Sequence, residues 1–265
     1  MSEKYLIDKA SLTALADITR AYNETPDKEY TLAEVTEQVK KASENYYNLF
    51  ENGISLLESE TAKSINAYGF CGVMDSVTRG VINLPNVSEI GQYALMGNFI
   101  EGFNMPSTVN IKSYAFSKCK WYTPIYFPNL ESIGSYAFQE SAKAGSAAAY
   151  NLYCPKLKSL GTGAFNPGSI GTNYLILKTL PVLEGIPDWG SVRKMKILLA
   201  SESYNNVDWE NEANWNEVKN FVECATTYDE NKQRYWKDFV SLGILTEEEI
   251  RRDYYGETVA EGGEV

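Results

Sequence analysis

The chain has 265 residues, a net charge of −11 and a sequence pI near 4.7. Such an acidic surface repels phosphate backbones and anionic lipids, so we expect neither nucleic-acid binding nor membrane insertion. The sequence contains no histidine, which removes the commonest general base and the commonest metal ligand.

Residues 1–62 are expected to form a helical module. Leu12, Leu15 and Ile18 recur at helical spacing, and Thr31 with Glu34 forms a capping box ahead of a further apolar stripe. Short helices cannot bury these stripes alone, so they either cap the segment that follows or dock on another protein. The N-terminus has no apolar signal region, and no apolar run approaches the roughly 20 residues that span a bilayer. We therefore expect synthesis in a bacterial cytoplasm without a signal peptide.

A short phrase then repeats itself over residues 63–200. Its common form is apolar-Pro-x-x-apolar-x-x-Ile-Gly-x-Tyr-Ala-Phe, and its recurrence at about 21 to 27 residues is typical of leucine-rich repeats. The copies begin at Leu84, Met105, Phe127 and Cys154, and the Ile or Leu anchors are Ile65, Ile90, Ile111, Ile133 and Leu160.

The repeat has a physical interpretation as one coil of a solenoid. A β-prone run precedes each proline, which lacks an N–H and closes the strand. The glycine after the anchor permits a tight bend, and the Tyr-Ala-Phe triplet is expected where coils stack, with its aromatic rings in the core. We expect about five coils, with insertions at 139–150 and 166–173 that either are plain loops or emerge on a binding face.

Residues 201–265 are expected to form a C-terminal helical cap and a flexible acidic tail. Trp215 and Val222 fit a helix that packs on the last coil, and Thr246 with Glu249 forms a second capping box. Leu245, Ile250 and Tyr254 would form the apolar side of the helix that follows.

The four cysteines are widely spaced, at Cys71, Cys119, Cys154 and Cys224, with no Cys-x-x-Cys pair. This spacing argues against a zinc site and against a disulfide framework. We interpret these cysteines as small buried hydrophobic residues.

The repeats resemble BspA-like leucine-rich repeats, whose pattern is close to L-P-x-x-L-x-x-I-G-x-x-A-F-x-x-C. The copies at Leu84, Phe127 and Cys154 match well, whereas Lys112 replaces the glycine of the copy at Met105, and Cys119 occupies the trailing Cys position. The resemblance implies an α+β protein with a right-handed solenoid and a binding rather than a catalytic role. Such repeats occur in bacterial surface adhesins and in phage-encoded virion proteins, and the helical pattern from Leu12 onward looks like the opening of many prophage tail proteins.

No catalytic constellation is found, so we expect no enzyme activity, no cofactor and no metal site. The first functional hypothesis is a phage virion protein, associated with the tail or capsid, that binds other virion proteins through its N-terminal helices. Its solenoid would contact a host surface protein, a glycan or a copy of itself. A bacterial interaction or adhesin-type protein and a carbohydrate-active enzyme are the alternatives. The residues predicted to contact a partner are Trp121, Tyr122 and Tyr150, because they lie between repeat cores.

Overall fold

The computed structural model describes residues 56–74, 76–77, 79–143, 151–165, 174–185, 196–212 and 214–258. The chain divides into two units, Met1–Gly53 and Ile54–Val265, and every described residue belongs to the second. The predicted N-terminal helical module therefore lies outside the described residues. Within the described part of the chain, no helix has the length and apolarity needed to cross a bilayer.

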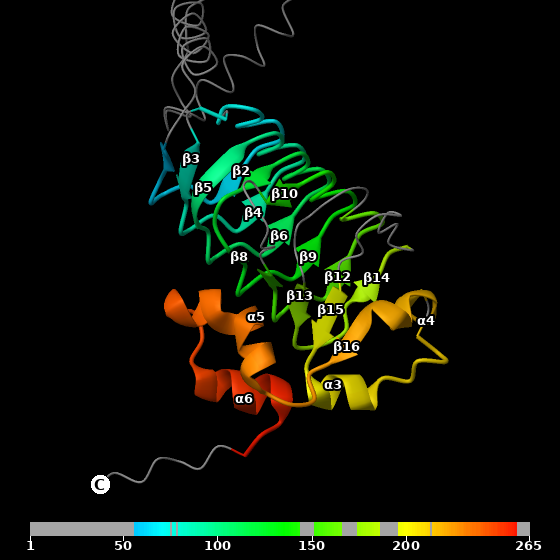
Figure 1. Cartoon of the computed structure of the whole chain (residues 1–265). Coiled ribbons are helices and arrows are strands. Elements are labelled where there is room, and N and C mark those ends of the chain that lie inside the picture. The colour runs from blue at the N-terminus through cyan, green and yellow to red at the C-terminus, as the bar shows by residue number, and fades with distance from the viewer. Residues whose placement is uncertain are drawn as a thin grey trace, which may run out of the picture. The chain divides into compact units, whose positions relative to one another are not determined.

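The second unit is a β-solenoid whose walls are three sheets of parallel strands (Figure 1). Every strand pairs with the equivalent strand one coil away along the chain, which is the pattern expected when a repeated segment stacks on itself. Sheet B holds one two-residue strand from each of six coils, so the solenoid is one coil longer than predicted. Its strands are β2 (Ser64–Ile65), β4 (Glu89–Ile90), β6 (Asn110–Ile111), β9 (Ser132–Ile133), β12 (Ser159–Leu160) and β14 (Val182–Leu183).

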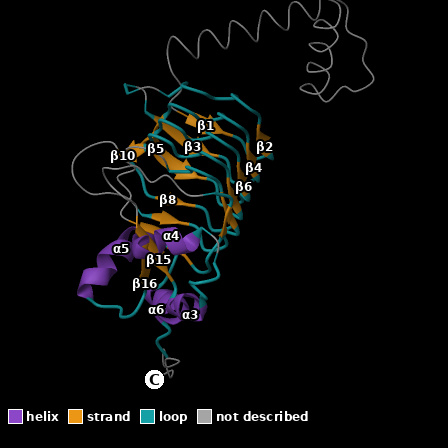
Figure 2. Cartoon of the chain, turned by 90° about the vertical axis from the view of Figure 1, so that its right-hand side faces the viewer, coloured by secondary structure: helices purple, strands orange, loops and turns teal. Residues whose placement is uncertain are grey.

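The opposite wall is made of two sheets that follow one another along the solenoid (Figure 2). Sheet A contains β1 (Leu56–Glu58), β3 (Gly80–Asn83), β5 (Phe99–Asn104), β7 (Lys120–Trp121) and β10 (Ala142–Lys143). Sheet C contains β8 (Ile125–Tyr126), β11 (Leu152–Tyr153), β13 (Tyr174–Leu177), β15 (Lys196–Leu199) and β16 (Val222–Cys224). Strands β1 and β16 extend this wall beyond the predicted limits of 63–200.

Two tight turns shape each coil. The first is a four-residue turn with proline in second place, closed for example by Val87 N–H donating to the Leu84 carbonyl at 3.2 Å. The second joins the glycine to the alanine of the motif, and Ala137 N–H donates to the Gly134 carbonyl at 3.3 Å. The predicted roles of proline and glycine are thus confirmed. Glycine is needed because a Cβ at Gly134 would lie 2.6 Å from the Ser113 nitrogen of the preceding coil.

The core is a column of apolar side chains enclosed by the sheets. The phenylalanine rings of successive coils stack in it, with centroids 5.3 Å apart for Phe116 and Phe138 and 5.4 Å apart for Phe138 and Phe165. The anchor Ile and Leu residues of sheet B and the motif alanines are also buried. Burial of this column is the main source of stability, because each coil covers the apolar face of its neighbour.

A polar ladder runs through the core at the trailing position of the repeat. Asn98, Cys119 and Ser141 occupy this position in three successive coils, and all three are buried. Their side chains donate to the carbonyls of Phe70, Leu95 and Phe116 respectively, each in the coil before. The trailing cysteine is therefore a hydrogen-bond donor between coils as well as a buried residue. All four cysteines are free, with Cys119 and Cys154 buried and Cys71 and Cys224 half-buried.

Sheet A and sheet C are separated by a shift in register. Trp121 pairs with Ile100, whereas the phase of the proline turn aligns Phe127 with Met105, so one extra residue lies in the later coil. Pro124 sits in that stretch and has no N–H to donate. The backbone N–H before the proline donates to a carbonyl of the next coil at Leu84, Phe127 and Cys154. At the equivalent residue Met105, no such hydrogen bond is found among the described residues.

The C-terminal helices are α3 (Ser201–Asn206), α4 (Trp215–Val218), the 3-10 turn η1 (Lys219–Phe221), α5 (Glu230–Ser241) and α6 (Glu247–Tyr255). Of these, α5 and α6 pack on the outer face of sheet C, while α3, α4 and η1 lie against the solenoid core at its last coils. Trp215 of α4 is buried in that core as predicted, but Val222 lies in β16 rather than in a helix. The capping box of Thr246 and Glu249 is confirmed, and Ile250 and Tyr254 are buried as predicted. Trp236 and Phe239 of α5 join them over Ile176 and Leu198 of sheet C. Because α5 and α6 lie along the sheet and β16 extends it, a purely helical cap on the last coil is not supported.

Candidate functional site

The strongest surface feature of the solenoid is a ladder of tyrosines from the repeated motif. We call Tyr68, Tyr93, Tyr114 and Tyr136 the tyrosine ladder. Neighbouring rings stack with centroids 4.8, 4.8 and 5.1 Å apart and planes within 17° of parallel. Tyr68, at the end of the stack, is 58% exposed, and the other three are half-buried. The expectation that these rings belong to the core is wrong: the Phe of the motif points inward and the Tyr points outward.

Each tyrosine of the ladder has a left-handed backbone. Their φ angles lie between 58° and 60°, a region that disfavours residues other than glycine. Each N–H donates to a carbonyl of the next coil, as Tyr93 N–H does to Ser113 at 3.2 Å. The fifth coil has Gly163 at this position, with a φ of 59°, and a Cβ there would lie 2.6 Å from the Tyr136 ring.

The energetics of the ladder point to a role for its side chains. A left-handed residue with a Cβ costs roughly 1–2 kcal/mol. An aromatic pair returns about 0.5–1.5 kcal/mol, so the stacking only offsets the strain. Since glycine would fit the same turn without strain, the tyrosines are not explained by the stability of the turn. They place a row of phenol hydroxyls along the solenoid.

The ladder also alters the acidity of Tyr114. The pKa of Tyr114 is raised above its usual value by partial burial and by the neighbouring phenols of Tyr93 and Tyr136. Its hydroxyl is therefore neutral over the physiological pH range, and a phenol hydroxyl both donates and accepts hydrogen bonds.

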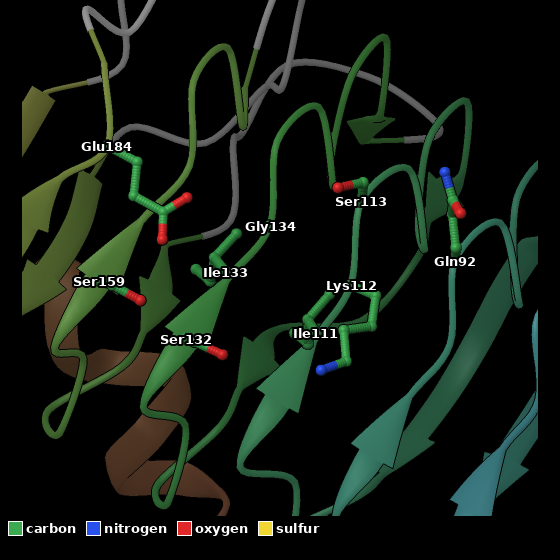
Figure 3. Close-up of a pocket in the computed structure, with 9 residues that line it drawn as sticks. All are labelled: Gln92, Ile111, Lys112, Ser113, Ser132, Ile133, Gly134, Ser159 and Glu184. Carbon is green, nitrogen blue, oxygen red and sulfur yellow. The ribbon is translucent and has the colours of Figure 1, made fainter.

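A shallow hollow lies beside the ladder, over the outer surface of sheet B (Figure 3). Its volume is about 380 Å³, and its lining includes the hydroxyls of Ser113, Ser132 and Ser159 and the amide of Gln92. Gln92 and Ser113 immediately precede Tyr93 and Tyr114 in sequence, so the hollow and the ladder share the same turns.

Charged side chains stand where the motif glycine is replaced. Lys112 and Glu184 occupy the position of Gly134 in their own coils, and both line the hollow. The Lys112 ammonium lies 3.1 Å from the Glu89 carboxylate, so its charge is balanced by a half-exposed partner. Among the described residues, no cation forms an ion pair with Glu184.

The residues predicted to bind a partner have three different outcomes. Trp121 is 1% exposed and packs against Phe103, Phe116 and Phe138, so its ring is not available at the surface and this prediction is wrong. Sequence reasoning placed Trp121 between cores, whereas β7 pairs with β5 and turns the side chain inward. Tyr122 is half-buried, with the Arg79 guanidinium 4.2 Å from its ring centroid, and it stays a prediction. Tyr150 lies outside the described residues.

The described residues hold no group of three or more His, Cys, Asp or Glu side chains that could bind a metal ion. Burial raises the pKa of the Cys119 thiol to about 12 and raises the pKa of Cys154 further, so both thiols are protonated and unreactive at neutral pH. The surface offers hydroxyl, amide and ring-edge contacts suited to binding.

The tyrosine ladder was missed although the sequence carries a signal for it. Tyrosine recurs two residues after the glycine, at a place that the BspA-like pattern leaves variable. A bulky residue repeated at a variable place in a tight turn indicates a left-handed residue on the outside of the coil.

Three parallel sheets, each with one short strand per coil, and a recurring Ile or Leu anchor define the described part of the chain as a leucine-rich-repeat solenoid. The comparison with known families agrees, because residues 41–170 match the family described as BspA type leucine rich repeat region, in six copies. This part of the chain therefore consists of BspA-type leucine-rich repeats. No curated protein matches the sequence.

Proposed function

We propose that this chain is a non-enzymatic binding protein of a bacteriophage virion. The outer surface of its solenoid makes the contact, either with a protein or with a host surface. The observation that carries the binding role is the tyrosine ladder, in which four stacked tyrosines on the outside of the coils hold a left-handed backbone conformation. Residues held in sparsely populated backbone conformations cluster at functional sites.

The placement in a virion rests on the sequence of residues 1–62, whose helical pattern resembles the opening of prophage tail proteins. In this proposal, the N-terminal helical module docks on other virion proteins and the C-terminal helices support sheet C. The acidic charge of −11 accords with a partner that is neither nucleic acid nor an anionic lipid surface.

A bacterial interaction or adhesin-type protein is the second candidate. The match of residues 41–170 to BspA-type repeats favours it equally, because such repeats imply binding without specifying the particle or cell that carries them. The two candidates differ in where the chain is found.

Immunogold labelling tests the proposal directly. Antibodies raised against the full chain are applied to particles induced from a lysogen that encodes it, and we expect label at one fixed position on the tail or capsid. Unlabelled particles, together with label on uninfected cells that lack the prophage, would refute the virion role and favour the adhesin-type protein.

A further inference from the structure

The hollow on sheet B is lined by polar groups from successive coils. Gln92, Ser113, Ser132, Ser159 and Glu184 come from five successive coils and all border it (Figure 3). Neighbouring strands of a sheet lie about 4.7–4.9 Å apart, so each successive coil offers a polar group at about that step along the solenoid axis, although the groups come from three different positions of the motif. This interval is comparable with the length of one pyranose unit in an extended glycan.

Charged side chains border the hollow at two of its coils. Lys112, Gly134, Gly161 and Glu184 hold the same position in consecutive coils, directly after the anchor residues of β6, β9, β12 and β14. Of these four residues, Lys112, Gly134 and Glu184 border the hollow, and two of the three carry a charge. Three coil steps separate Lys112 from Glu184, which corresponds to about 14 Å.

The chemistry of the lining favours a polyhydroxylated ligand over a protein. Protein interfaces depend on buried aromatic or aliphatic anchors, and the apolar members of this lining, Ile111 and Ile133, are core residues that are 1% exposed. Hydroxyl, amide and carboxylate groups instead offer both donors and acceptors, which match the two roles of a sugar hydroxyl.

The charges favour a neutral ligand. The Lys112 ammonium is already paired with Glu89 at 3.1 Å, and Glu184 has no ion-pair partner among the described residues. An anionic glycan would meet an unbalanced carboxylate and a protein of charge −11. A neutral glycan can hydrogen-bond to the same carboxylate, and a charge-assisted hydrogen bond is the stronger kind.

We propose that the sheet B hollow binds a linear neutral glycan whose chain runs along the solenoid axis, with about one sugar ring for each coil. The inference rests on the proposed binding function and names the class of ligand that the surface recognises. The phenol hydroxyls of Tyr93 and Tyr114, which follow the lining residues directly, would extend the contact at one side of the hollow.

The test is a titration of the full chain with cellohexaose, chitohexaose, maltohexaose and laminarihexaose, with hexagalacturonate as an anionic comparison. At least one neutral hexaose is expected to bind and hexagalacturonate is not. Ser159→Trp places an indole in the hollow and is expected to weaken that binding at least about tenfold. The matched control is Ser64→Trp, at the same strand position of sheet B in the first coil, exposed and outside the lining.

Glu184→Ala gives a second variant at an exposed position where folding is not at risk, and it is expected to weaken binding several-fold. The inference is overturned if no neutral hexaose binds at millimolar concentration, or if Ser64→Trp and Ser159→Trp weaken binding equally. The proposed function and the glycan inference can fail separately. If the chain is found on virions and its attachment to host envelopes is abolished by protease treatment of the envelopes but unaffected by Ser159→Trp, the partner is a protein. The proposed function then stands and the glycan inference is overturned.

Discussion

Replacement of Asn98 tests the polar ladder in the core. Its side chain is fully buried and makes three hydrogen bonds: it accepts from Met74 N–H at 2.8 Å and donates to the carbonyls of Phe70 at 2.8 Å and Leu95 at 2.7 Å. Asn98→Ala removes all three. The Leu95 carbonyl keeps the Cys119 thiol as a donor at 3.0 Å, but no other partner for the Met74 N–H or the Phe70 carbonyl is found among the described residues.

The expected loss follows from these orphaned groups. An ordinary hydrogen bond contributes about 1 kcal/mol, and a buried group left without a partner costs about 1–3 kcal/mol. Two orphaned groups and one lost hydrogen bond together predict that the free energy of unfolding falls by about 3–7 kcal/mol. Asn98→Ser should lose less, because Ser141 already satisfies the Phe116 carbonyl from the equivalent position.

The assay is equilibrium unfolding in urea, followed by circular dichroism and tryptophan fluorescence. Asn86→Ala is the matched control, since the Asn86 amide is exposed and donates only to the Glu60 carbonyl, at 2.8 Å, so its loss should cost under about 1 kcal/mol. If the Asn98→Ala and Asn86→Ala proteins unfold at the same urea concentration, the reasoning about the polar ladder is refuted.

Three further predictions concern other parts of the solenoid. The phenol pKa values of Tyr114, Tyr126 and Tyr153 are raised mainly by burial. The stability that these phenols contribute is therefore present below a pH of about 10 and is lost as the pH rises through their folded pKa values. A titration followed by absorbance at 295 nm in which all tyrosines behave like free tyrosine would contradict this prediction. Trp121→Phe should lower the melting temperature less than Trp215→Phe. The buried Trp121 indole N–H has no partner among the described residues, whereas the Trp215 indole N–H donates to the Pro181 carbonyl at 2.7 Å. Equal decreases in melting temperature would contradict this prediction. With a chromogenic disulfide reagent at pH 8, Cys119 and Cys154 should react only after denaturation, and rapid labelling of all four thiols in the native protein would show that the core opens.

The repeat itself could be predicted because its residues act through the local backbone. Proline at the second position of a turn and glycine at a close approach between coils impose their geometry wherever they occur, and both recur in register with Ile90, Ile133 and Leu160. The short runs before each proline were likewise correctly interpreted as strands. The capping box at Thr246 is equally local, which is why α6 was predicted with its buried Ile250 and Tyr254.

The candidate site could not be predicted to the same degree. The outward direction of Tyr93 depends on a φ angle of 58°, which is set by bonds to the next coil rather than by the residue itself. The inward direction of Trp121 depends on the pairing of β7 with β5, which joins residues about a whole coil apart. The hollow is lined by residues of several coils, from Gln92 to Glu184, and a depression on a surface has no direct signature in a sequence.

The interruption between sheet A and sheet C has a mechanical consequence. Sheet B runs without a break through six strands, while the facing wall is joined less firmly where β5 meets the coil of β8. A solenoid in which one wall is a continuous sheet and the opposite wall is divided between two sheets bends most easily about the continuous sheet. Among the described coils, we therefore expect the solenoid to bend most easily at the coil that contains Pro124, where sheet A gives way to sheet C, while sheet B keeps its pairing.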